Sequence, residues 1–82
     1  MKVRLRVGAR ILVSRSEDIR VKKQATILDL LSKGMKKSEV NQIAKDGIVI
    51  LNGVIVDDLD TRISDKDEVL VFNMKSIKMN KK

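Results

Sequence analysis

Residues 48 to 56, Ile-Val-Ile-Leu-Asn-Gly-Val-Ile-Val, carry the strongest local structural signal in the sequence. Asn52 and Gly53 both tolerate positive φ angles, which a two-residue type I′ turn requires. The residues on either side of them are aliphatic and are typical of β-strands. The stretch therefore predicts a tight hairpin between two apolar strands.

The N-terminal segment has the alternating pattern of a half-buried strand. Residues 2 to 7, Lys-Val-Arg-Leu-Arg-Val, put aliphatic side chains on one face and basic side chains on the other. We expect residues 11 to 13 to extend this arm, and the polar run of residues 14 to 18 predicts a turn. Residues 19 to 22 alternate again, which indicates a second strand with its aliphatic side chains facing the core.

Two helices are predicted in the middle of the chain. Apolar residues after Thr26 recur at three- and four-residue steps, and Thr26 with Asp29 has the pattern of a reciprocal N-terminal cap. Gly34 is expected to end or bend this main helix. We expect Ser38 to cap a second short helix, which Gly47 stops.

The C-terminal part predicts the strand that closes the sheet. Residues 57 to 67 form an acidic loop, and residues 68 to 72, Glu-Val-Leu-Val-Phe, are nearly all apolar, as in a central strand. The order of elements indicates an α+β fold, in which a mixed sheet packs on one main helix and leaves its other face open. We expect a single domain over residues 1 to 72 and a flexible lysine-rich tail over residues 73 to 82.

The composition argues against several kinds of chemistry. The 82 residues include no cysteine, histidine, tryptophan, tyrosine or proline, and Phe72 is the single aromatic residue. The usual general base near neutral pH and the usual zinc ligands are therefore missing. The acidic residues between positions 57 and 68 lack the ligand spacing and the glycine of a calcium loop. We predict no catalytic site, no metal site and no bound cofactor.

Hydropathy predicts a cytoplasmic protein. The longest uninterrupted aliphatic run, residues 48 to 51, is far shorter than the roughly 20 residues that cross a bilayer. The N-terminus alternates basic and aliphatic residues and lacks the apolar block of a signal peptide. We expect a monomer that does not contact membranes.

The formal net charge of +7 is unevenly distributed. Residues 1 to 40 contain 11 basic and 4 acidic side chains, whereas residues 41 to 72 contain 3 and 7. Four basic residues on the outer face of the first two strands and four around the second helix are candidates for binding an anion or RNA: Arg4, Arg6, Arg20, Lys22, Lys33, Lys36, Lys37 and Lys45. A solvated strand or helix face explains the same residues without a ligand.

Two segments resemble the β-grasp superfamily of ubiquitin-like proteins. Residues 19 to 31, Ile-Arg-Val-Lys-Lys-Gln-Ala-Thr-Ile-Leu-Asp-Leu-Leu, are similar to the second strand and helix start of these proteins. Asn52-Gly53 with residues 59 to 72 is similar to their closing segment. The resemblance covers most of residues 1 to 72 and is closest to the small subunit of molybdopterin synthase, the thiamine-pathway sulfur carrier and the ubiquitin-related modifiers. It implies a β-grasp fold and a protein partner.

The C-terminal sequence departs from the sulfur-carrier pattern. Such carriers end in Gly-Gly, whose terminal carboxylate is adenylated and thiolated by a partner enzyme. This sequence ends in Met-Asn-Lys-Lys and has no glycine after Gly53. The resemblance therefore implies a non-catalytic adaptor that does not form a thiocarboxylate.

Residues 37 to 53 also resemble the αL RNA-binding motif of a small-subunit ribosomal protein and of pseudouridine synthases, in the spacing of their glycine, valine and Asn-Gly elements. The TGS domain of tRNA synthetases is similar as well. These resemblances imply an alternative function, a small basic RNA-binding module associated with the ribosome or tRNA, and a different arrangement of residues 34 to 53. The sequence thus leaves open whether the partner is a protein or a structured RNA.

Overall fold

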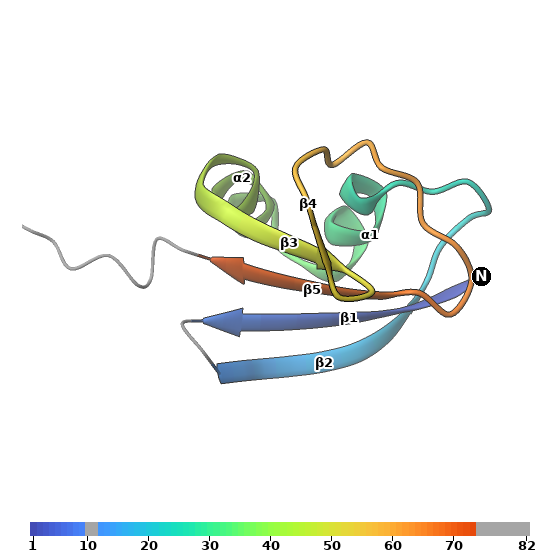
Figure 1. The fold of residues 1–82 in the computed structure, drawn as a ribbon, viewed down its shortest axis with the longest axis horizontal. Coiled ribbons are helices and arrows are strands. Elements are labelled where there is room, and N and C mark those ends of the chain that lie inside the picture. Colours follow the sequence, from blue (N-terminus) through green and yellow to red (C-terminus); the bar gives the residue numbers. More distant parts are fainter. Residues whose placement is uncertain (10–11, 74–82) are drawn as a thin grey trace, which may run out of the picture.

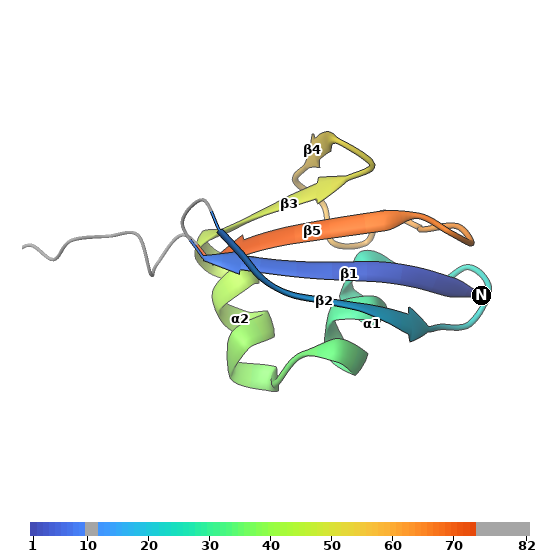
Figure 2. The same cartoon turned by 90° about the horizontal axis from the view of Figure 1, so that it is seen from below.

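A computed structural model describes residues 1–9 and 12–73 of the chain. The elements follow in the order β1 (Lys2–Ala9), β2 (Leu12–Arg20), α1 (Ile27–Gly34), α2 (Lys37–Asp46), β3 (Gly47–Leu51), β4 (Val54–Val56) and β5 (Glu68–Asn73). The five strands form one sheet in the order β2-β1-β5-β3-β4 (Figure 1). Both helices lie on the same face of this sheet (Figure 2), which confirms the α+β architecture.

The central strand, β5, joins two hairpins that are far apart in the sequence. It runs parallel to β1 and antiparallel to β3. The first antiparallel hairpin consists of β1 and β2, and the second consists of β3 and β4. The prediction of a central final strand is therefore confirmed. The mixed sheet with its two covering helices is compatible with a β-grasp-like fold.

The core lies between the sheet and the helices. Leu5 pairs in register with Val69, and Val49 with Val71, and all four side chains are buried. One helix, α1, packs against β1 and β2, while α2 packs against β3 and β5. The buried helix residues are Ile27, Leu30, Leu31, Val40 and Ile43. No helix of residues 1–9 and 12–73 has the length and apolar character needed to cross a membrane.

The first helix begins and ends where the sequence predicts. The hydroxyl of Thr26 accepts a hydrogen bond from the Asp29 amide, and Asp29 Oδ2 accepts one from the Thr26 amide. Both halves of the reciprocal cap are therefore present. Gly34 is the last residue of α1, and the Met35 amide donates to the carbonyl of Leu31 over 2.9 Å.

The second helix is longer than the sequence analysis predicts. It has 10 residues against 8 in α1, so α1 is not the single main helix. Ser38 lies inside α2 and does not cap it. The residue before the helix is Lys36, and its amide donates to Glu39 Oε1 over 3.0 Å. Gly47 follows the last turn and ends α2 as predicted.

The predicted turn at residues 14 to 18 is wrong, because this run belongs to β2. Residues 15 to 18 pair in register with residues 4 to 7 of β1. The run is polar because β2 is an edge strand, and the side chains of residues 15 to 18 are exposed. Residues 10 and 11, between the two strands, lie outside the described residues, and so do residues 74 to 82 of the predicted tail.

The hairpin between β3 and β4 forms as predicted. Asn52 and Gly53 have φ angles of 50° and 86°, which the type I′ turn requires. The side chain of Asn52 also reaches the start of β5. Its Nδ2 donates to Asp67 Oδ1 over 3.0 Å, and its Oδ1 accepts from the Glu68 amide over 2.9 Å. The turn is thereby fixed to the central strand.

We expect Gly47→Ala to lower the free energy of unfolding by about 1–3 kcal/mol. A Cβ atom at position 47 would lie 2.7 Å from both the Cα and the carbonyl oxygen of Ile43, and rotating a side chain cannot relieve a contact with backbone. Urea unfolding measures the change. The control is Asn41→Ala, at an exposed position of α2. Its free energy of unfolding should stay within about 0.5 kcal/mol of the wild-type value. An unchanged midpoint for Gly47→Ala would contradict the close approach of β3 to α2.

Candidate binding surface

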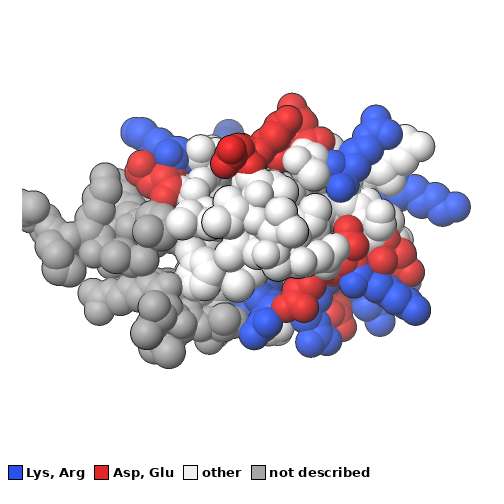
Figure 3. Space-filling view, viewed as in Figure 1, with Lys and Arg blue, Asp and Glu red and all other residues white. Residues whose placement is uncertain are grey.

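The sheet face away from the helices is divided into a charged half and an apolar half. The charged half is formed by β1 and β2, where Arg4 lies opposite Asp18 and Arg6 lies opposite Ser16. The apolar half consists of the residues that alternate with the buried ones on the other three strands. These residues, called the apolar patch below, are Ile48, Ile50, Ile55, Leu70 and Phe72. Figure 3 shows the uncharged area with charged side chains above it, below it and to its right.

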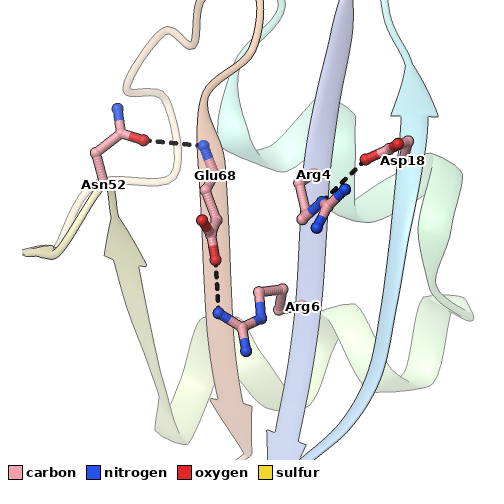
Figure 4. A network of polar contacts seen from close by, with 5 residues as sticks. All are labelled: Arg4, Arg6, Asp18, Asn52 and Glu68. Atoms are coloured by element: carbon pink, nitrogen blue, oxygen red, sulfur yellow. Dashed lines mark hydrogen bonds and ion pairs between the residues drawn. The ribbon is translucent and has the colours of Figure 1, made fainter.

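Carboxylates hold both β1 arginines of the predicted anion-binding set. Arg4 Nε donates to Asp18 Oδ1 over 3.1 Å, and Arg6 Nη1 donates to Glu68 Oε2 over 2.7 Å (Figure 4). One carboxylate comes from β2 and the other from β5. Half-exposed pairs of this kind contribute only about 0–1 kcal/mol each to stability. The two carboxylates nevertheless offset the positive charge of the arginines, which a bound phosphate would need.

A shallow hollow beside these pairs has no net charge. It is lined by three cationic and three anionic residues: Lys2, Arg4, Lys66, Asp18, Asp67 and Glu68. The sequence did not predict this balance, because the predicted turn removed Asp18 from the sheet and because no local pattern places Glu68 beside β1. Cross-strand partners depend on register between distant segments, which local patterns do not give.

Of the two remaining strand residues of the predicted set, Arg20 lies on the outer sheet face with the two β1 arginines, whereas Lys22 does not. Arg20 is exposed and lies opposite Lys2 at the end of β2. Lys22 lies beyond the end of that strand and lines a hollow beside α1 together with Asp29 and Lys33. The prediction that Lys22 shares the outer sheet face with Arg20 is therefore wrong. Lys33 Nζ donates to the carbonyl oxygen of Arg20, so it reaches towards β2 and not towards α2.

The three lysines predicted around the second helix lie at its two ends. Lys36 and Lys37 are exposed at the start of α2, and Lys45 is exposed in its last turn. From Lys37 to Lys45 the helix rises by about 12 Å. The eight predicted basic residues therefore form no single cluster among the described residues.

Much of the net charge belongs to residues that the structure does not describe. Of the 18 basic side chains, 13 lie in residues 1–9 and 12–73, together with all 11 acidic ones. The described residues thus carry a formal charge of +2 out of +7. The other positive charges belong to Arg10, Lys75, Lys78, Lys81 and Lys82.

Several acidic side chains of the β4–β5 loop fix the loop itself. Asp58 Oδ1 accepts a hydrogen bond from the Asp60 amide over 2.9 Å, and Asp67 Oδ2 accepts one from the Ser64 amide over 2.7 Å. Asp65 Oδ1 accepts from a main-chain amide of β1 over 2.8 Å. No group of three or more His, Cys, Asp or Glu side chains that could hold a metal ion occurs in the described part of the chain.

Sequence analysis did not identify the apolar patch. The apolar run of β5 predicted a central strand, without distinguishing the residues on its two faces. In the structure, only alternate residues of β3 and β5 face the helices, and their neighbours lie on the open face. The period-two spacing within residues 48 to 56 and 68 to 72 is the signal that locates these neighbours. At the edge, Val54 and Ile55 are 63% and 65% exposed.

In comparisons with known proteins, no family model and no curated protein matches this chain. Function is therefore inferred from the chemistry and geometry of the surface.

We expect the double variant Asp18→Asn/Glu68→Gln to elute from heparin at higher salt than the control Asp57→Asn/Asp60→Asn. Both variants gain the same net charge, but only the first removes the carboxylates that hold the two β1 arginines. The freed guanidinium groups are then available to sulfate groups. A sodium chloride gradient measures the difference. Equal elution of the two variants would contradict the view that the ion pairs restrict these arginines.

Proposed function

We propose that the protein is a non-catalytic β-grasp adaptor that binds another protein through the open face of its sheet. The observation that carries this proposal is the apolar patch on β3, β4 and β5, which no described element covers. Ile55 is exposed and the other four side chains of the patch are partly exposed, and accessible apolar side chains gathered in one place mark interaction surfaces. The β-grasp resemblance of residues 19 to 31 and 59 to 72 supports the same proposal. On this resemblance we propose a protein similar to the sulfur carriers and ubiquitin-related modifiers, with binding as its activity.

The surroundings of the patch have the composition of a protein interface. Such interfaces combine an apolar centre with a polar rim, and stable ones bury about 800 Å² on each partner. Here the rim contains the pairs Arg4–Asp18 and Arg6–Glu68, which hold charged groups of both signs at fixed positions. A partner with complementary charges is oriented by this rim, while burial of the patch provides the affinity.

An RNA-binding module is the alternative function. The net charge of +7 and the exposed lysines at the ends of α2 support it. Two features favour a protein partner instead. Both β1 arginines are already paired with carboxylates, and Phe72 is the only aromatic side chain on which an RNA base can stack.

Site-specific photo-crosslinking tests this proposal. A benzophenone amino acid replaces Phe72 in the patch, and in the matched control it replaces Asn41, which is exposed on α2. We expect protein adducts from the Phe72 position that survive ribonuclease, and few from the Asn41 position. Adding Ile50→Lys to the Phe72 variant should reduce the adducts about fivefold, because a charge then enters the apolar contact.

Two results would contradict a protein partner at the open face. One is a set of adducts from Phe72 that ribonuclease removes, which would favour the RNA module. The other is an equal yield of protein adducts from Phe72 and Asn41, because nonspecific contact does not distinguish the two faces of the sheet.

A further inference from the structure

The two edges of the sheet differ in how their main chain is protected. Edge strands expose unpaired N–H and C=O groups, and proteins usually blunt them with charges or cover them. On β2, residues 15 to 18 are polar and exposed. Arg15 Nη2 donates to the Gly34 carbonyl over 3.2 Å, and Lys33 Nζ donates to the Arg20 carbonyl. Two side-chain bonds thus tie β2 to the C-terminal turn of α1, and one of them occupies a carbonyl of the edge strand.

The other edge strand, β4, has no such protection. Its residues, Val-Ile-Val, include no charge and no proline, and Val54 and Ile55 are 63% and 65% exposed. Leu51 pairs with Val54 across the two-residue turn, which makes them a hydrogen-bonded pair. Because such pairs alternate along an antiparallel ladder, the N–H and C=O of Ile55 point away from β3. This edge is open to pairing with another strand.

A small hollow lies beyond the end of β4. The pairing of β4 covers only residues 49 to 51 of β3, so Gly47 and Ile48 extend past it. The hollow has a volume of about 120 Å³, and its lining includes these two residues with Ile43, Val56 and Leu59. Small-molecule sites have volumes of roughly 300–1,000 Å³. The hollow therefore has room for one side chain of a partner and is too small for a metabolite.

The charge next to this edge is negative, although the protein as a whole is basic. Asp57 lines the hollow, and Asp58 and Asp60 follow it in the β4–β5 loop. All three side chains are exposed. Figure 3 shows acidic side chains beside the uncharged area of the sheet face. A basic segment is complementary to this edge, whereas an acidic segment would be repelled.

We propose that β4 binds an extended, basic segment of a partner protein, which adds a further strand to the sheet. Main-chain groups of the segment pair with Ile55, one of its side chains enters the hollow, and basic side chains face Asp57 and its two acidic neighbours. The inference rests on the proposed function, because it specifies how the partner docks. A second copy of this chain is the poorer occupant, since pairing two three-residue strands buries far less than the 800 Å² or so per partner of a stable dimer.

The test uses the full chain and a synthetic peptide. The probe is the end-blocked peptide Lys-Val-Lys-Val-Lys-Val-Lys-Val-Lys, and the charge control has Glu at each Lys position. We expect the lysine peptide to shift the NMR amide signals of residues 54 to 57 and to slow hydrogen exchange at the Ile55 amide. The glutamate peptide should do neither. Attraction between opposite net charges does not explain such binding, because the protein and the lysine peptide both carry a positive net charge.

Two charge-reversing variants distinguish peptide binding at the β4 edge from peptide binding at the β2 edge. Asp57→Lys should weaken binding of the lysine peptide about fivefold, since it reverses the charge beside the hollow. Glu17→Lys makes the same charge change on β2 and should leave the affinity unchanged. Well-dispersed NMR spectra of both variants show that each remains folded.

Several results would overturn the inference. Shifts confined to Arg6, Leu70 and their neighbours would reject the β4 edge but leave the open face as the binding surface. Shifts on β2, or no shifts at all, would reject the β4 edge, and the proposed function would then be judged by crosslinking at Phe72 alone. Equal binding of the glutamate peptide, or an unchanged affinity of Asp57→Lys, would reject a basic segment as the occupant.

Discussion

The pairing of β5 with both β1 and β3 is the interaction on which the rest of the structure depends. A two-stranded hairpin is marginal in water, and the two hairpins of this chain share no ladder except through β5. Val69 and Val71 are fully buried at this seam, beneath the two helices. The same strand also shapes the open face, because the carboxylate of Glu68 at its start holds Arg6 and the Glu68 amide donates to Asn52 Oδ1. Core, turn and charged rim are therefore fixed together.

Sequence patterns predicted the parts of the fold that depend on neighbouring residues. The Asn52-Gly53 turn and the Thr26–Asp29 cap each involve residues at most three positions apart, and both formed as expected. The polar run of residues 14 to 18 was assigned wrongly because a turn and a solvated edge strand have the same composition. Pairing with β1 decides between them, and that information lies in another part of the chain.

The candidate site was less predictable than the fold for the same reason. The sequence placed Arg4 and Arg6 on the outer face of a strand, which is correct, but it did not identify their carboxylate partners. Asp18 lies 14 positions from Arg4, and Glu68 lies 62 positions from Arg6. The apolar patch likewise appears only when β3, β4 and β5 are placed side by side. Its members are Ile, Leu and Phe, residue types that are common in protein cores. The arrangement of the strands decides which of these side chains the helices do not cover.

The position of β5 in the chain also has a consequence for biosynthesis. Translation completes β1 at Ala9, and about 60 further residues are added before β5 begins at Glu68. At roughly 5–20 residues per second this interval lasts about 3–12 s, during which one side of β1 has no partner. Charged side chains on an unpaired strand discourage association with other nascent chains. Throughout this interval Arg4 and Arg6 are the charged side chains on the outer face of β1, and Arg6 meets its carboxylate only when β5 is added.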